Sequence, residues 1–293
     1  MVVATGPAGG EYARFVESLA ARLGSASTIR VANTEGSVSN AFLVDRGKAR
    51  FGLVQSDVAA AAVGGRGLFA MTGRLQRLRA VASLFPEQLH VVVRADSGIG
   101  SIAQLAGRRI ALGDTGSGTR HTGLRVLAAH GLEPGAYTEA FVQGGPGEAV
   151  EQLATGTLDA VVAVVSAPWR QLVQVAARLP LAILSLDPAA MDRVLVDVPG
   201  LVSLAIPART YPGQESAVPS LAATALLVTD ADTPDPVVAA ALESIFAAAA
   251  VSGRGVAASR LSRERALDGV TIPLHPGAAA YFRPHPPGEQ PRG

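Results

Sequence analysis

The chain has 293 residues, of which 48% are hydrophobic and 17% charged, with a formal net charge of +1 and no cysteine. This length allows one large domain or two lobes with separate cores, while the small net charge argues against nucleic acid or an anionic membrane as a partner. The lack of cysteine excludes disulfides, thiolate metal sites and cysteine nucleophiles. No apolar run reaches about 18 residues, so we expect no transmembrane segment, and the first residues show no signal-peptide pattern.

Residues 2–24 predict a strand, a glycine-rich loop and a helix. The apolar run 2–4 leads into the loop 5–10, and apolar positions then recur at helical spacing as far as Leu23. The first backbone N–H groups of a helix lack partners and carry partial positive charge, so such a loop can hold a small anion. The alternative is a loop that shapes only its own turn, with the tyrosine packed in the core. The residues of this unit that we expect to contact a ligand are Thr5, Gly9, Gly10 and Tyr12.

Polar side chains follow the next two expected strands, 28–31 and 50–54. The loop 33–37 precedes an expected helix over 38–46, and another helix opens after residue 55. The polar groups at these positions either cap the helices or face a ligand. An Asp among them could hold the ammonium group of a ligand. The candidate residues are Ser37, Gln55, Ser56 and Asp57.

The strongest motif lies at residues 108–131, after two expected strands at 78–84 and 89–93 that Pro86 separates. It repeats the order of the first unit, with a strand, a glycine-rich loop and a helix that ends near Gly131. Its loop offers N–H groups and hydroxyls to a carboxylate, and an arginine could add a charge-assisted bond. A turn capped by its own Ser or Thr is the alternative. The candidate residues are Thr115, Gly116, Ser117, Gly118, Thr119 and Arg120.

A second repeated unit indicates two similar lobes. The order helix, glycine turn, strand, polar loop and helix at 40–63 recurs at 147–177. Ligands of open α/β sheets bind outside the carboxyl ends of the strands, where all of these loops lie. Ser166 and Pro168 follow the expected strand 158–165 and are therefore further candidates. We predict two α/β lobes that face each other across one ligand cleft.

The remaining segments set the expected lobe boundaries. The segment 181–220 is rich in proline and irregular, and we expect it to return the chain to the first lobe before a strand at 222–229 and a helix at 235–250. The expected ranges are 1–88 and 200–293 for lobe one, 89–199 for lobe two, and 283–293 for a disordered tail.

The order of short motifs along the chain resembles that of the solute-binding subunits of TRAP transporters of the TAXI type, over roughly residues 2–282. The matching motifs are Thr5-Gly6 to Gly9-Gly10 with Tyr12, Thr34-Glu35-Gly36-Ser37 with Asn40, Gln55-Ser56-Asp57, Leu89 to Arg94 with Asp96-Ser97-Gly98-Ile99, Gly116-Ser117-Gly118-Thr119, Asp159-Ala160, and Leu274-His275-Pro276-Gly277-Ala278. The resemblance implies the type II periplasmic-binding-protein fold and adds Glu35 to the candidate site. Three positions depart from the family pattern: Ala4 replaces a glycine, Ala13 a second tyrosine, and Arg120-His121 an acidic residue.

The resemblance implies a periplasmic or otherwise extracytoplasmic solute-binding protein, a monomer, rather than an enzyme. Such a protein closes around a small carboxylate, an amino acid such as glutamate or a dicarboxylate, and delivers it to the permease subunits of a TRAP transporter. We expect no metal and no cofactor, since the five histidines show no metal-ligand spacing and no nucleophile elbow occurs. The alternative is a cytoplasmic enzyme or ligand-sensing domain on the same fold.

Overall fold

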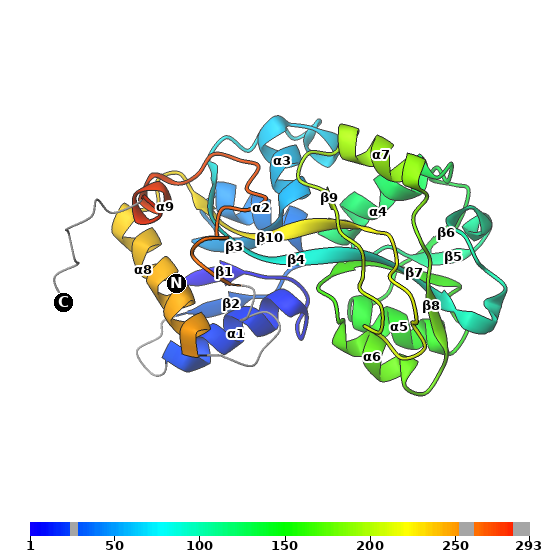
Figure 1. Cartoon of the computed structure of the whole chain (residues 1–293). Coiled ribbons are helices and arrows are strands. Elements are labelled where there is room, and N and C mark those ends of the chain that lie inside the picture. Colours follow the sequence, from blue (N-terminus) through cyan, green and yellow to red (C-terminus); the bar gives the residue numbers. More distant parts are fainter. Residues whose placement is uncertain (24–28, 252–260, 284–293) are drawn as a thin grey trace.

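The computed structural model describes residues 1–23, 29–251 and 261–283, and Figure 1 shows its helices and strands. The strands are β1 (Val2–Ala4), β2 (Arg30–Ala32), β3 (Phe51–Gln55), β4 (Leu78–Arg94), β5 (Arg109–Ala111), β6 (Thr138–Ala140), β7 (Ala160–Val165), β8 (Leu181–Ile183), β9 (Val202–Ser203) and β10 (Leu221–Asp230). The helices are α1 (Glu11–Leu23), α2 (Ser37–Asp45), α3 (Ser56–Gly64), α4 (Gly118–Ala129), α5 (Pro146–Ala154), α6 (Arg170–Ala176), α7 (Pro188–Asp197), α8 (Asp235–Val251) and α9 (Pro276–Tyr281).

The strands of the described residues form one hydrogen-bonded network in the order β2-β1-β3-β10-β4-β7-β5-β6, with β8 beside β4 and β9 beside β10. At each end the strands run parallel: β1 with β2 and β3, and β5 with β6 and β7. The central strands β4 and β10 run antiparallel to each other and to their neighbours β7 and β3. Figure 1 shows these two long strands passing between two halves of the molecule. The parallel strands at each end therefore belong to separate halves that β4 and β10 connect.

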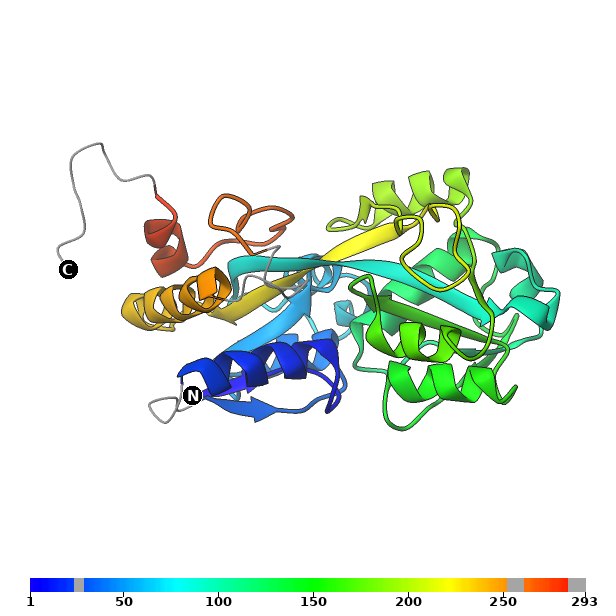
Figure 2. The same ribbon diagram turned by 60° about the horizontal axis from the view of Figure 1, so that its bottom comes forward.

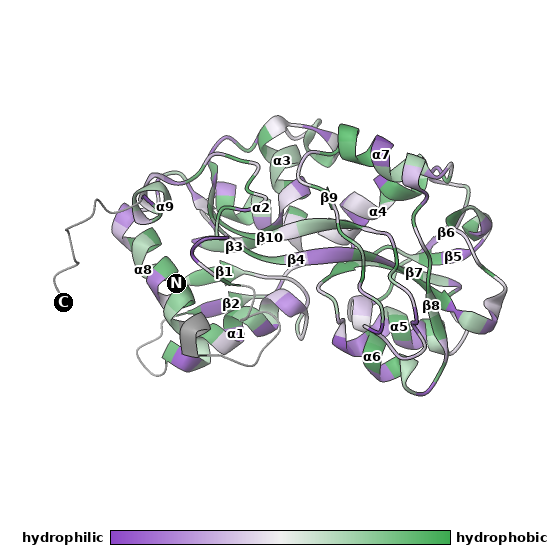
Figure 3. Ribbon diagram, in the orientation of Figure 1, coloured by the Kyte–Doolittle hydropathy of each residue, from purple (hydrophilic) through white to green (hydrophobic). Residues whose placement is uncertain are grey.

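Helices cover both faces of the sheet in each half (Figures 1 and 2). In the first half, α2 and α3 pack on one face, and α1 and α8 on the other. In the second half, α4 and α7 cover one face, and α5 and α6 the other. Figure 3 shows hydrophobic residues concentrated on the strands, as expected where both faces are buried. The predicted two-lobed α/β fold is confirmed.

The predicted break between strands 78–84 and 89–93 is wrong, because both belong to β4. Pro86 is paired with Thr224 of β10, and the register between β4 and β10 shifts just before it, next to Phe85. Pro86 therefore interrupts the strand only locally. As a result β4 carries Glu87 and Gln88 into the region between the two halves (Figure 3, the hydrophilic stretch in the middle of β4).

The segment 181–220 is more regular than predicted, because it contains β8, α7 and β9. The Asp187 side chain caps α7 by accepting a hydrogen bond from the Ala190 N–H at 3.0 Å. Pro188 occupies the first turn of this helix, where its missing N–H is not needed. Here proline opens a helix, whereas the sequence prediction took it as a mark of irregular chain.

The expected lobe boundaries stay a prediction. Gln88 pairs with β10 on one side and β7 on the other, next to the expected boundary at residue 88. Ile206 and Tyr211 pack with Trp169 of the second half, which favours a return to the first half at β10, later than residue 200.

Two further predictions concern the ends of the chain and the membrane. Except for Arg283, the tail expected at 283–293 lies outside the described residues. Within the described ranges, no helix combines the length and apolar character needed to cross a membrane.

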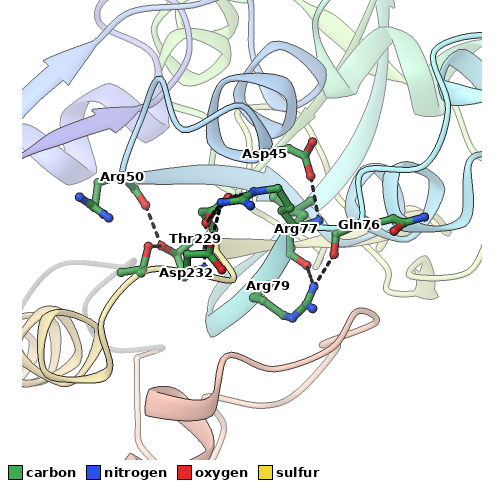
Figure 4. Close-up of polar contacts among 10 residues, drawn as sticks. Asp45, Arg50, Gln76, Arg77, Arg79, Thr229 and Asp232 are labelled. Carbon is green, nitrogen blue, oxygen red and sulfur yellow. Dashed lines mark hydrogen bonds and ion pairs between the residues drawn. The ribbon is translucent and has the colours of Figure 1, made fainter.

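An ion cluster ties the turn before β4 to the end of β10 (Figure 4). The Arg77 guanidinium donates to both carboxylate oxygens of Asp230 at 2.7 and 2.8 Å and to Asp232 at 2.8 Å. The Arg77 backbone N–H donates to Asp45, the last residue of α2, at 3.0 Å. The bidentate pair with Asp230 links the start of β4 to the end of β10, and the backbone hydrogen bond to Asp45 links it to α2.

Candidate functional site

A cavity of about 110 Å³ lies between the two halves, and we call it the interlobe cavity. Its walls come from the loops that follow β1, β2, β5 and β6, from the end of β3, from β7 and from the middle of β4. These loops lie at the carboxyl ends of parallel strands, where open α/β sheets bind ligands. The first turns of α1 and α4 both line the cavity, through Tyr12 and Gly118. Their backbone N–H groups lack partners within the helix and favour an anion.

Four carboxyl side chains line the interlobe cavity: Glu11, Glu35, Glu87 and Asp114. Arg, Lys and His are missing from the lining that the described chain contributes. Gln55 adds an amide oxygen, Oε1, that is buried and has no hydrogen-bond partner among the described residues. In the described ranges, no group of acidic or histidine side chains is arranged to hold a metal ion. The wall thus combines N–H groups suited to an anion with oxygens that accept hydrogen bonds.

Glu87 is the most enclosed of these acids, with 3% of its surface exposed. Its Oε2 accepts a hydrogen bond from the Tyr12 hydroxyl at 2.6 Å. Burial raises the pKa of Glu87 well above its ordinary value, and the negative charge of Glu11 raises it further. Burial also raises the pKa of Tyr12, which packs in the core and lines the cavity at once. Glu87 therefore keeps its proton to a higher pH than an exposed glutamate does.

Two of the acids join the halves across the interlobe cavity. Glu35 accepts a hydrogen bond from the Gly116 N–H at 2.7 Å, and Glu11 accepts one from the Ser166 N–H at 3.0 Å. The Val38 N–H donates to the Gly116 carbonyl at 3.0 Å. Carboxylates of the first half therefore occupy backbone donors of the second half, including one in its glycine-rich loop.

Many of the predicted site residues lie at this cavity or beside it. Those that line the interlobe cavity are Gly10, Tyr12, Glu35, Ser37, Gln55, Ser117, Gly118 and Thr119. Gly9, Ser166 and Pro168 line an adjoining pocket of about 130 Å³, which shares Gly10 and Glu11 with the interlobe cavity. Ser117 also caps α4, since its Oγ accepts from the Arg120 N–H at 3.1 Å. Ser117 therefore caps its helix and also lines the cavity, while its contact with a ligand stays a prediction.

The other predicted site residues line neither space: Thr5, Ser56, Asp57, Thr115, Gly116 and Arg120. The Arg120 guanidinium pairs with both oxygens of Glu139 at 2.5 and 3.1 Å. Asp57 is buried and accepts a hydrogen bond from the Thr122 hydroxyl at 2.5 Å. In this structure neither charged side chain reaches the cavity.

The remaining predicted residues support the walls through local contacts. The Ser56 hydroxyl donates to the Gly200 carbonyl at 2.7 Å, and the Thr5 hydroxyl donates to the Ala32 carbonyl at 3.3 Å. Gly116 holds Glu35 through its N–H, as described above.

Glu11, Glu87 and Asp114 line the cavity but are not among the residues predicted from the sequence. Glu87 carries a signal that could have found it, because it is the only acidic residue in the 17-residue strand β4, whose residues are mostly buried. A buried acid in such a strand needs a partner or a ligand. Glu11 begins helix α1 and Asp114 lies in a loop. Acidic residues commonly face solvent at such positions, so the sequence around them carries no such signal.

The two-lobed α/β fold, with a cavity at the strand ends, is an architecture that solved binding proteins share. The chain belongs to the NMT1-like family, whose model matches residues 3–284. The expected likeness in fold to periplasmic binding proteins is confirmed by the solved structures described next. Assignment to the TAXI type stays a prediction.

Solved structures of low identity share the fold. The alkanesulfonate-binding protein SsuA from Xanthomonas axonopodis pv. citri, bound to MOPS, is 17% identical with a TM-score of 0.52, over 98% of this chain and 84% of that one. MatC from Rhodopseudomonas palustris, with bound malate, is 17% identical with a TM-score of 0.56, over 85% and 84%. The periplasmic binding protein BugD is 16% identical with a TM-score of 0.54, over 85% and 82%. SsuA and BugD are described as binding proteins.

Proposed function

We propose that the protein is an extracytoplasmic solute-binding protein that captures a small carboxylate in the interlobe cavity. The observation that carries this proposal is the convergence of the N-termini of α1 and α4 on one cavity. Each N-terminus offers backbone N–H groups and partial positive charge, and both favour an anion. The ligand is an amino acid such as glutamate or a dicarboxylate.

Contacts between the halves support a role for lobe closure in capture. Glu35 and Glu11 bind backbone N–H groups of the opposite half directly beside the cavity. A ligand that contacts both walls adds to these contacts and favours the closed arrangement over an open one. Closure therefore converts ligand binding into a change of shape that a membrane partner can recognise.

The partner that we propose is the permease of a TRAP transporter. This step rests on the resemblance of the ordered motifs to TAXI-type subunits. The extracytoplasmic location has the same basis and is supported by the likeness in fold to BugD, which is described as periplasmic. The bound malate of MatC, a dicarboxylate, supports the ligand class.

Ligand-dependent thermal unfolding tests this function with amino acids, dicarboxylates, neutral sugars and metal cations as separate probes. A carboxylate at about 100 times its Kd should add roughly 2.7 kcal/mol to the unfolding free energy and raise Tm. Ser117→Ala removes a hydroxyl worth about 1 kcal/mol and should reduce this rise. Ser244→Ala, on α8 away from the cavity lining, is the matched control and should leave it unchanged. A rise with sugars or metal cations and none with carboxylates contradicts the proposal.

A further inference from the structure

The lining of the interlobe cavity offers one buried acceptor that nothing in the described structure satisfies. Gln55 is 3% exposed, and its Oε1 has no hydrogen-bond partner among the described residues. This oxygen lies against Gly118, only 2.1 Å from the place that a Cβ on Gly118 would occupy. A buried amide oxygen without a donor is costly, so the position calls for a ligand that donates.

Glu87 presents a second acceptor to the same cavity. Its Oε2 is bonded to the Tyr12 hydroxyl, and the carboxyl group lies almost wholly buried in the lining. Burial of a carboxylate is stable only when a positive group or several donors face it. No cationic side chain of the described residues lines this cavity, so the protein supplies no such charge from its own wall.

The other three acidic side chains of the lining also favour a positively charged ligand group, although they are not its proposed direct partners. Glu11 and Glu35 accept hydrogen bonds from backbone N–H groups, and Asp114 is half-buried and interacts electrostatically with Glu35. Their negative charges stand around the cavity and attract a cation at short range. They also disfavour a ligand whose only charges are negative.

We propose that the ligand of the interlobe cavity carries an ammonium group, which donates hydrogen bonds to the Glu87 carboxylate and to Gln55 Oε1. This inference rests on the proposed function and narrows it, because the carboxylate of the same ligand faces the N-termini of α1 and α4. A zwitterionic amino acid matches both features of the wall, whereas a plain dicarboxylate matches one. Glu87 and Gln55 are thus the residues that determine specificity, in place of the Asp57 expected from the sequence.

Calorimetric titration with matched pairs of ligands tests the inference. The pairs are L-alanine with L-lactate, L-aspartate with L-malate, and L-glutamate with L-2-hydroxyglutarate, in which a hydroxyl replaces the ammonium group. Propylamine serves as an amine without a carboxylate. In the best-binding pair, the amino acid should bind the wild-type protein about tenfold or more tightly than the hydroxy acid, as expected for a charged hydrogen bond.

Substitutions in the wall should remove this preference. Glu87→Gln keeps an acceptor for the Tyr12 hydroxyl but removes the charge, so amino-acid affinity should fall about tenfold or more while hydroxy-acid affinity holds or rises. Gln55→Met keeps the volume of the side chain, removes the amide oxygen, and should shift the ratio in the same direction. Glu151→Gln, outside the cavity on α5, is the matched control and should keep the preference.

The outcomes separate this inference from the proposed function. If hydroxy acids bind the wild type as tightly as amino acids, or if both wall variants keep the preference, the inference is overturned and the carboxylate function stands. If propylamine binds and no carboxylate does, the inference stands and the proposed ligand class is overturned. If no probe binds, both are overturned.

Discussion

His90 lies on β4 with none of its surface exposed, close to the polar residues that line the cavity. Its Nδ1 is 2.8 Å from the Gln88 carbonyl and its Nε2 is 2.7 Å from the Tyr211 hydroxyl. A neutral ring satisfies both, with Nδ1–H donating to the carbonyl and Nε2 accepting from the hydroxyl. Burial lowers the pKa of His90 from 6.5 to about 4, so the ring stays neutral in the folded protein near pH 7.

This lowered pKa predicts an acid-dependent loss of stability. Below about pH 6.5 the unfolded chain binds a proton at this histidine that the folded chain does not, so the unfolding free energy falls as the pH drops toward 4. The difference of the two pKa values corresponds to roughly 3 kcal/mol. Denaturant titrations across this range should show a smaller fall for His90→Gln than for the wild type. Identical pH profiles for the two proteins would show that the ring is not held neutral.

We predict that Glu87 releases a proton when a ligand with an ammonium group binds. Its pKa is raised in the empty protein, mainly by burial, so its carboxyl group keeps a proton to higher pH than usual. An ammonium group favours the carboxylate and lowers this pKa, so binding expels the proton and the affinity rises with pH until Glu87 is ionised without ligand. Calorimetry in buffers of different ionisation enthalpy should detect this release in the wild type. The prediction fails if Glu87→Gln releases as many protons.

From the sequence, the loops that line the interlobe cavity could be predicted better than the directions of the charged side chains. The glycine-rich loops and Ser117 could be found because glycine, hydroxyl and helix-start patterns are local. The direction of a charged side chain depends on partners from distant segments. Arg120 turns to Glu139, and Asp57 to Thr122 of the opposite half, and neither partner can be assigned from spacing along the chain.

At the scale of elements, the loop before α2 and the loop before α4 act together as a clasp between the halves. Glu35 accepts from the Gly116 N–H, and the Gly116 carbonyl accepts from the Val38 N–H at 3.0 Å. Gly36 lies at φ 132°, where a side chain is disfavoured, and a Cβ there would be 3.2 Å from the Ser117 Cα. Close backbone approach therefore depends on glycine in both loops.

Removing the carboxylate of this clasp should open the protein. Glu35→Ala deletes one charge-assisted hydrogen bond, worth about 1 kcal/mol for a partly exposed group, and shifts the ligand-free population toward separated lobes. Small-angle X-ray scattering without ligand should give a larger radius of gyration than for the wild type. Glu17→Ala, on the exposed side of α1, is the control. An unchanged radius in Glu35→Ala would show that the clasp does not hold the halves together.

Proline positions explain which elements the sequence predicted incorrectly. Pro86 and Pro188 were both interpreted as breaks, but Pro86 lies beside a register shift within β4 and Pro188 in the first turn of α7. Both are places where a missing N–H costs little. Which of these places a proline takes depends on the neighbouring strand or the preceding cap, so the strand-loop-helix units were predicted well and the segments around these prolines were not.

At the scale of the whole molecule, β4 and β10 place the cavity between two halves with their own cores. Each half has a sheet covered by helices on both faces, and the strand ends of both meet at the interlobe cavity. The repeat in the sequence predicted this symmetry, because the same order of elements gives the same half-fold. The path of β4 and β10 through both halves could not be predicted, since it depends on pairing between segments more than 100 residues apart.

The central claim is that a small carboxylate binds in the interlobe cavity, and calorimetric titration of the wild type beside Gly118→Val tests it most directly. A Cβ on Gly118 would lie 2.1 Å from Gln55 Oε1 and 2.9 Å from Ser37 Oγ, so valine fills the cavity wall where the loops meet. Gly100→Val is the control, since a Cβ there meets only Gln104, at 3.7 Å. We predict one ligand per chain for the wild type and Gly100→Val, and an affinity about tenfold or more lower for Gly118→Val. Equal carboxylate affinity in all three proteins, or saturable binding of a neutral sugar in place of every carboxylate, would contradict the claim.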